Sequence, residues 1–494
     1  MLRPPNQQPF LIGSLAAHKT LWDKVAGVGA SHTAEQQYER GECLEGTRVE
    51  LRRMIHEWEQ AGEQGSPLCW LTGAAGVGKT AIAMSAAKAC EQEGLLVSSF
   101  LFFRSDPKRN NPQALWLSVV HGLVSTMPDM QPLIERRISK DPRILEARLE
   151  DQFRALVLDP FLDPVLNPSL SWQRCLLAFL LQTLCLVLSN VVLLDVFWAF
   201  LTPLLPVAPV QVSHSNVVII DGLDECSDEA TQLRILSMIR DAVQHAPHFP
   251  LRFLICSRPE AWIKEAFSAE CFRRLLKVIV VDKAFEDIIT YCHHQFREIV
   301  DNPKYKHVRF PNPWPSQEDF GTLVDRSCSQ FVYVATVFRF MTLSGNHPVD
   351  KLRLILDSSP ANRPRVSPYP ELDALYHTIL DSNPKEVHTI LVVIFVIVDY
   401  LETSPVHIEL LLGLSPGQVD LALRGMHSVL QIHGWTDPIK LLHTSFRDYL
   451  LDQSRSQGFY IDLDAQKPIV AQQWLEKLTP CKVQAYRYEA SHAY

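Results

Sequence analysis

Short apolar runs and helical patterns alternate along the first 300 residues. The runs are rich in branched and aromatic side chains, which is typical of buried strands, and the stretches between them repeat apolar residues with a helical period. Strands are predicted at residues 67–72, Leu95–Phe103, Asn216–Asp221, Leu251–Arg258 and Lys277–Asp282. Helices are predicted at Thr80–Cys90, Gln113–Thr126, Asp141–Val157, Glu229–Val243 and Ala284–Ile299, and a capping box at Thr47–Glu50 predicts one more before the first strand. This alternation predicts an α/β fold, a parallel sheet with helices on both faces.

From about residue 316 the pattern becomes helical. The predicted helices are Gln317–Cys328, Phe331–Met341, Val349–Asp357, Glu371–Asp381 and Glu386–Leu401. The segment Pro405–Ser454 then predicts two short helices, a hairpin and a final helix, which is a winged-helix pattern. We therefore expect a linker or N-terminal remnant (1–40), an α/β domain (41–300), a helical domain (301–404), a winged-helix domain (405–455) and a tail (456–494).

The composition is that of a globular protein with several cores. Of the 494 residues, 47% are hydrophobic and 21% are charged, and the net charge is −8. This acidic balance provides no general attraction to nucleic acid or anionic lipid. The eleven cysteines are scattered, and the N-terminus has no apolar signal-peptide core. Both features favour reduced thiols and a cytoplasmic location.

The residues Gly73–Thr80 carry the pattern G-x-x-x-x-G-K-T of a phosphate-binding P-loop. In such a loop, glycines let backbone N–H groups surround phosphates, the lysine reaches the β- and γ-phosphates, and the hydroxyl ligates Mg²⁺. The loop lies between a predicted strand and a predicted helix, as the motif requires. The residues expected to contact the nucleotide here are Gly73, Gly76, Val77, Gly78, Lys79, Thr80 and Ala81.

An acidic cluster follows the predicted strand at Asn216–Asp221. A P-loop site needs a second carboxylate to hold Mg²⁺ and a polar group to position the attacking water. Asp221 ends the strand and is the expected Mg²⁺ ligand together with Thr80, while Asp224 is the preferred water-polarising group and Glu225 the second choice. Arg258 closes the next strand, where a guanidinium can respond to the charge of the γ-phosphate.

These motifs resemble those of NACHT-domain NTPases of the STAND class, and most closely the fungal NOD-like receptors, with a P-loop domain of the nephrocystin-3 N-terminal type. The resemblance rests on Gly73–Thr80, Val217–Glu225, Leu251–Pro259 and Leu441–Tyr449. It covers roughly residues 22–480, apart from an apolar insert. It implies that His443 contacts the β-phosphate of bound ADP and acts as a latch. More weakly, it implies that Thr47 and Arg48 lie at the adenine edge.

Two features depart from that family. Its members usually carry an N-terminal effector domain and C-terminal repeats, and neither is visible in this chain. The predicted helix Phe331–Met341 also lacks the Gly-x-Pro sequence that many relatives place near the nucleotide.

Residues 161–216 contain only three formal charges, Asp163, Arg174 and Asp195, and hydropathy alone predicts a membrane helix at Cys175–Leu194. Against this, one membrane crossing would separate the P-loop from Asp221, although both must lie at one end of the same sheet. We interpret residues 164–212 as an insertion foreign to the fold, such as a translated intron. The alternative is a genuine hairpin, buried or in contact with a membrane.

The sequence thus favours an ATP/ADP-dependent, Mg²⁺-dependent signalling switch with slow hydrolysis, which self-associates when activated and serves innate immunity. Its trigger and effector proteins are unknown, and no nucleic-acid or membrane partner is expected. One alternative is a housekeeping AAA-type ATPase, although no basic track supports it. Another is a scaffold stabilised by nucleotide without turnover, and whether the chain is an enzyme stays open.

Overall fold

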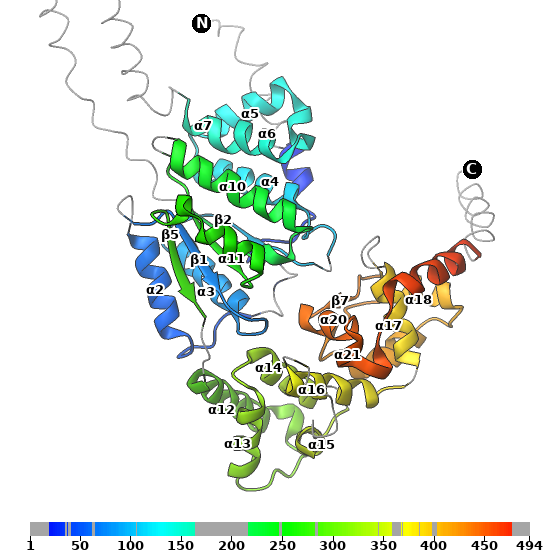
Figure 1. Ribbon diagram of the computed structural model, residues 1–494. Coiled ribbons are helices and arrows are strands. Elements are labelled where there is room, and N and C mark those ends of the chain that lie inside the picture. The colour runs from blue at the N-terminus through cyan, green and yellow to red at the C-terminus, as the bar shows by residue number, and fades with distance from the viewer. Residues whose placement is uncertain are drawn as a thin grey trace, which may run out of the picture.

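The computed structural model describes residues 19–34, 37, 41–61, 65–104, 106–163, 216–246, 249–281, 285–343, 345–357, 367, 369–384, 386–397 and 403–476. The predicted insertion at 164–212 lies outside these residues. In the view of Figure 1 an α/β region occupies the upper part, a helical region lies below it, and the C-terminal elements lie to the right.

A five-stranded parallel sheet forms the centre of the α/β region. Its strands are β1 (Leu68–Thr72), β2 (Leu96–Leu101), β3 (Val217–Asp221), β4 (Arg252–Ser257) and β5 (Leu276–Val280), in the order β2-β3-β4-β1-β5. Thr72 pairs with Ser257, and Asp221 pairs with Cys256. Because these strands are parallel and end at the same level, the residues that follow β1, β3 and β4 meet at one edge of the sheet.

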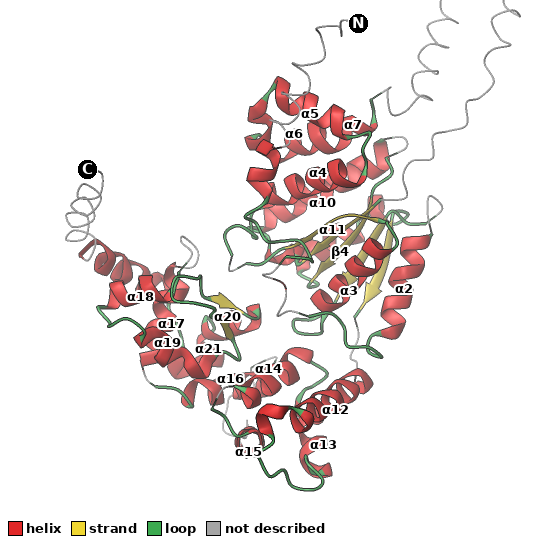
Figure 2. Ribbon diagram, turned by 180° about the vertical axis from the view of Figure 1, so that it is seen from behind, coloured by secondary structure: helices red, strands yellow, loops and turns green. Residues whose placement is uncertain are grey.

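Helices cover both faces of the sheet (Figures 1 and 2). Alternating strand residues point to opposite faces, so Trp70, Ile220 and Ile255 belong to one hydrophobic cluster, and Leu71, Ile219 and Leu254 belong to another. The helices on the first face include α4 (Pro112–Thr126), α5 (Gln131–Lys140), α6 (Leu149–Phe153), α7 (Asp159–Phe161), α10 (Glu229–His245) and α11 (Ala261–Ser268). Those on the second face are α2 (Val49–Gln60) and α3 (Lys79–Gln92).

The rest of the described chain is helical, apart from one short hairpin. The helical region contains α12 (Phe285–Asp301), α13 (Gln317–Arg326), α14 (Phe331–Thr342), α15 (Pro348–Asp357), α16 (Pro370–Asp381) and α17 (Glu386–Ile397). After it come α18 (Pro405–Leu412), α19 (Gln418–Leu423), the antiparallel strands β6 (Leu430–Gln431) and β7 (Lys440–Leu441), α20 (Thr444–Leu450) and α21 (Gln453–Ser456). The order helix, helix, hairpin and helix is the one expected for a winged helix.

One hydrophobic cluster runs through both of these C-terminal regions, from Ile288 to Val470. Among the described residues, Phe103 is the member of this cluster that comes from the α/β region. The helical and winged-helix regions therefore pack as one unit, which we call the lid, against the α/β region.

The capping box predicted at Thr47–Glu50 is wrong. The Thr47 hydroxyl donates to the carbonyl of Leu44 at 2.7 Å instead of capping α2. Arg48 is the N-cap residue, in a left-handed conformation, and its side chain does not cap the helix. The start of α2 is set by contacts of Arg48 with distant parts of the chain, described below.

The helix predicted at Asp141–Val157 is interrupted. A 3₁₀ turn covers Pro142–Glu146, and a separate helix begins at Leu149 after two residues of extended backbone. The Gln152 amide donates to the carbonyl of Leu145 at 3.0 Å. The Leu145 carbonyl loses its helical partner at the interruption, and the Gln152 amide replaces that partner. The break therefore costs little in lost hydrogen bonding.

No helix in the described part of the chain combines the length and the apolar character needed to cross a membrane. Every cysteine that lies in the described ranges is a free thiol, as expected from the scattered spacing.

Candidate functional site

The P-loop connects β1 to α3 in the conformation that its glycines permit. Gly76 and Gly78 have φ angles of +75° and +94°, which side-chain-bearing residues rarely adopt. A Cβ atom on Gly76 would also clash with Val332 at the start of α14, and the Val332 N–H donates to the Gly76 carbonyl at 3.2 Å. The loop is therefore packed directly against the lid.

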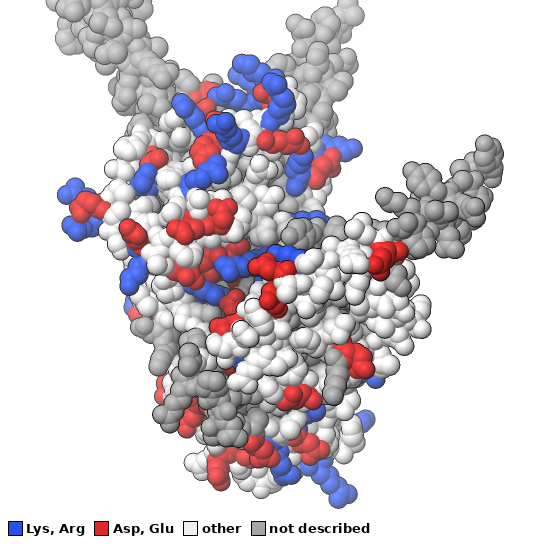
Figure 3. Space-filling model, turned by 45° about the vertical axis from the view of Figure 1, so that its right-hand side comes forward, with Lys and Arg blue, Asp and Glu red and all other residues white. Residues whose placement is uncertain are grey.

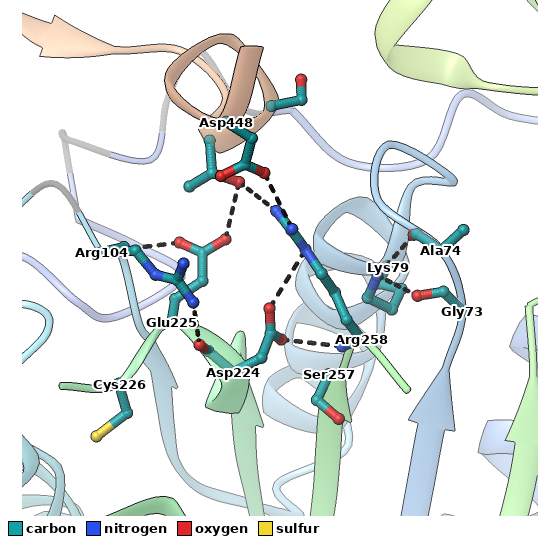
Figure 4. A network of polar contacts seen from close by, with 12 residues as sticks. Gly73, Ala74, Lys79, Arg104, Asp224, Glu225, Cys226, Ser257, Arg258 and Asp448 are labelled. Carbon is teal, nitrogen blue, oxygen red and sulfur yellow. Dashed lines mark hydrogen bonds and ion pairs between the residues drawn. The ribbon is translucent and has the colours of Figure 1, made fainter. Parts of the chain in front are cut away.

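Lys79 begins α3 and folds back over the loop. Its ammonium donates to the carbonyls of Gly73 and Ala74 at 2.7 and 2.8 Å (Figure 4). Burial lowers the pKa of Lys79, while the charges of Asp224 and Asp221 act in the opposite direction. Neutral carbonyls are weaker acceptors than anionic oxygens, so the Lys79 ammonium is well suited to bind a phosphate instead.

Asp221 lies at the carboxyl end of β3 and is 2% exposed. It lines the same cavity as Thr80, the other predicted Mg²⁺ ligand. Among the described residues, no group of three or more His, Cys, Asp or Glu side chains is arranged to hold a metal unaided. A hydroxyl and one carboxylate still suit Mg²⁺, which keeps several waters and takes its remaining ligands from substrate phosphates.

Asp224 and Glu225 follow in the loop after β3. Both Asp224 carboxylate oxygens face Arg258: Oδ1 accepts from its backbone N–H at 2.9 Å, and Oδ2 lies 3.3 Å from Nε. Glu225 accepts from the backbone N–H of Arg104 at 3.2 Å and from the Thr444 hydroxyl at 3.3 Å. The two predicted catalytic carboxylates are thus engaged by protein donors in this conformation.

Arg258 connects the α/β region to the lid. Besides contacting Asp224, its guanidinium donates to Asp448 at 3.0 Å and to the Thr444 hydroxyl at 2.9 Å, both on α20 (Figure 4). Burial acts to lower the pKa of Arg258, but the carboxylates of Asp448 and Asp224 outweigh it and raise that pKa. The arginine stays charged and holds two regions of the chain together.

His443 ends the hairpin and caps α20. Its Nδ1 accepts the backbone N–H of Ser445 at 3.0 Å and lies 2.6 Å from the Ser445 hydroxyl. Because Nδ1 accepts a hydrogen bond, the neutral ring carries its proton on Nε2. The residue also lines the cavity, so the sequence-predicted latch lies beside the P-loop.

Arg48 lines the cavity too, but its guanidinium contacts other groups of the protein. The guanidinium donates to the Val77 carbonyl in the P-loop at 2.6 Å, lies 3.7 Å from the Asp287 carboxylate and lies over the Phe331 ring. Arg48 therefore fixes the P-loop relative to α12 and α14. Thr47 lies on the same wall of the cavity.

These groups surround a cavity of about 360 Å³, within the usual size range of ligand sites. Its floor comes from the P-loop, the ends of β3 and β4, and residues 41–48. Its roof comes from α12, α14 and the segment Leu442–Thr444. The sequence-predicted residues that line the cavity are Thr47, Arg48, Gly76, Gly78, Lys79, Thr80, Ala81, Asp221, Asp224, Glu225, Arg258 and His443, whereas Gly73 and Val77 do not line it.

Several residues of this site were not predicted from the sequence. Thr444 follows His443 directly and Asp448 lies further along α20, and their role depends on Arg258, which precedes them by 186 and 190 residues. Arg104 contacts both catalytic candidates, since it also donates to the Asp224 carbonyl at 2.7 Å. Arg339 had a signal in the sequence, because it is the one charged residue of the otherwise apolar helix α14.

The parallel sheet, the P-loop after β1 and the acidic end of β3 define a P-loop NTPase fold of the α/β class. Consistent with this fold, the chain matches the family model "Nephrocystin 3, N-terminal" over residues 50–169 and 195–258, which is less than half of its length. Of the predicted insertion at 164–212, only residues 170–194 lie outside that match, and residues 164–169 and 195–212 lie inside it.

No curated protein matches the chain. One solved structure, "Structure of Drosophila ORC bound to poly(dA/dT) DNA and Cdc6 (conformation 1)", is similar at 10% identity and a TM-score of 0.25, covering 97% of this chain and 68% of that one. A TM-score this low supports no argument about the fold or function.

Proposed function

We propose that this protein is an ATP/ADP-dependent molecular switch in which a nucleotide holds the lid closed over the P-loop. The observation that carries the proposal is the composition of the cavity, whose walls come from both the α/β region and the lid. A ligand in such a cavity contacts both regions at once. Binding therefore changes the equilibrium between closed and open arrangements by the difference in affinity between the two.

The residues fit a Mg²⁺-bound nucleotide. Lys79 and the P-loop N–H groups would hold the phosphates, Thr80 and Asp221 would hold Mg²⁺, and the metal would supply charge neutralisation for phosphoryl transfer. Asp224 would orient the attacking water, with Glu225 as the alternative.

The contacts of Arg258 support a closed, resting conformation. Arg258 is bound to Asp448 and Thr444 of α20, so a γ-phosphate would compete with these two groups for the same guanidinium. Losing them would release α20. The same contacts engage Asp224 and Glu225, which supports slow hydrolysis while the lid is closed.

A nucleotide-stabilised scaffold is the second candidate. The engagement of both Asp224 oxygens by Arg258 favours it, because a carboxylate held this way is poorly placed to activate water. The switch and the scaffold differ in whether bound nucleotide exchanges and whether the lid responds.

The resemblance to fungal NOD-like receptors extends the proposal to signalling through self-association. Opening of the lid would uncover the surface through which copies of the chain, and its effector, assemble. Basic and acidic side chains are intermixed on the face shown in Figure 3, so that face provides no continuous basic track for a nucleic acid.

The test begins with the nucleotide that copurifies with the protein, identified by mass spectrometry. The switch predicts bound ADP that exchanges with added ATP, together with a change in oligomeric state by light scattering after exchange. ADP that never exchanges would support the scaffold, and a Lys79→Ala protein that binds ADP as well as wild type would refute the site.

A further inference from the structure

Helix α14 presents one open stripe to the cavity. In residues 331–341, Phe331, Ala335 and Arg339 are partly exposed, and the residues between them are buried. They are four residues apart, so they lie on one face of the helix, and all three line the cavity. The stripe carries a ring, a methyl group and a guanidinium.

The start of α14 lies at the P-loop, through the hydrogen bond from Val332 to Gly76. Side chains of a helix tilt toward its N-terminus, so the long Arg339 side chain is inclined back across Ala335 toward that loop. Ala335 is too small to block this path. The Tyr291 phenol lies close by: burial raises its pKa, and the charge of Arg339 acts against that increase.

We propose that Arg339 is a nucleotide-binding residue, whose guanidinium donates to a phosphate oxygen from the lid side of the cavity. A guanidinium has donors only, in a fork that matches a phosphate, so a phosphate is the nucleotide group it recognises best.

This inference rests on the proposed function, since it assumes a nucleotide in the cavity. It adds a contact from the helical part of the lid to the phosphate that the P-loop holds from below. The presence of a phosphate would then be communicated to α14 directly, independently of His443 and α20.

The experiment compares ADP and adenosine as competitors of a fluorescent ADP analogue. Arg339→Met keeps the aliphatic stem and removes the donors. ADP should then bind about 10- to 100-fold more weakly, which is the usual effect of losing a hydrogen bond to a charged group, while adenosine should change less than about twofold. Arg339→Lys should fall between Arg339→Met and wild type. Arg353→Met, an exposed arginine on α15 away from the cavity, should bind like wild type.

Two results would overturn the proposal: ADP affinity within about twofold of wild type in Arg339→Met, or an equal loss for ADP and adenosine, which would assign Arg339 to the sugar or base. Thermal unfolding without nucleotide shows whether each variant folds. If Arg339→Met does not fold, Arg339→Lys takes its place, with weaker ADP binding still required because the fork is lost. Lys79→Ala is measured in parallel, and unchanged affinity there would refute the proposed function itself.

Discussion

The floor and the roof of the cavity are built in different ways. The floor lies at one edge of a sheet whose central strands are fully buried, and it is continuous with the two α/β clusters. The roof belongs to a separate cluster, to which the α/β region contributes Phe103 among the described residues. Arg258 (to α20), Arg48 (to Asp287 and the Phe331 ring) and the Gly76–Val332 contact join the two. A few mostly polar contacts between floor and roof can break at a low cost in free energy. We therefore expect the floor to bind the nucleotide and the roof to move in response to it.

Removing the floor's main cation should have the largest effect. In Lys79→Ala, ADP affinity should fall on the order of 1,000-fold, because truncating one partner of a buried, hydrogen-bonded charge pair costs about 4 kcal/mol. Isothermal titration calorimetry measures this loss. Lys264→Ala is the matched control, since Lys264 is an exposed lysine of α11 that does not line the cavity. A similar loss in both variants would contradict the assignment of Lys79.

The next effect separates chemistry from binding. Asp224→Asn should retain nucleotide but slow hydrolysis about 100-fold, the usual contribution of a positioned acid–base group. Single-turnover release of phosphate measures the rate, and Asp241→Asn, at an exposed carboxylate of α10, is the control. An unchanged rate would transfer the role to Glu225, which Glu225→Gln then tests.

A smaller effect should follow from loosening the roof alone. Asp448→Asn weakens the contact of α20 with Arg258, and ADP should dissociate about fivefold faster, since a half-buried charge pair contributes about 1 kcal/mol. Stopped-flow release of a fluorescent ADP analogue measures the rate. Asp464→Asn, at a fully exposed carboxylate, should leave it unchanged. An unchanged rate in Asp448→Asn would show that this contact does not hold the lid.

His443 has two separable roles in the roof. His443→Ala removes the cap of α20 and should lower the free energy of unfolding by about 1 kcal/mol, while His443→Asn replaces the cap. Both variants should weaken ADP binding by about fivefold if the imidazole also contacts the nucleotide. Denaturation and ADP titration of the same two proteins distinguish the roles. Full ADP affinity in His443→Asn would leave His443 with a structural role only.

The smallest effect concerns the α/β region alone. The Glu59 side chain is 1% exposed, and burial raises its pKa. Its protonated form is favoured in the folded state, so the associated stability is present at low pH and is lost as pH rises from about 4.5 through the raised pKa. In Glu59→Gln, the free energy of unfolding should no longer fall over this pH range, as measured by urea titrations at several pH values. The ADP affinity should not change. The same decline in Glu59→Gln as in wild type would point to another group.

The floor was predictable because its residues are either adjacent in sequence or fixed by strand register. Gly73–Thr80 is one continuous segment, Asp221 is the last residue of β3, and Arg258 directly follows β4 in the same parallel sheet. In the roof, the family resemblance pointed to one site residue, His443. The partners of Arg258 on α20, and the stripe of α14, depend on how the lid packs against the sheet, which no local pattern encodes.

The two errors at helix ends have the same physical origin. Thr47 had the right neighbours for a capping box, but Arg48 takes the N-cap position because its backbone N–H and side chain bond to Asp287 and Val77. Near Asp141, the Gln152 side chain stabilises a break that apolar spacing alone would not suggest. In both places a distant or side-chain hydrogen bond replaced the local one.

The sheet also determines where this protein tolerates added sequence. The chain leaves the described α/β region after Asp163 and returns at Asn216, which precedes the amino end of β3. Nucleotide chemistry is concentrated at the opposite, carboxyl end of that strand. This junction is therefore a suitable site for protein engineering. Insertion of a fluorescent reporter domain there, or removal of residues 170–194, which lie outside the family match, should leave ADP binding intact.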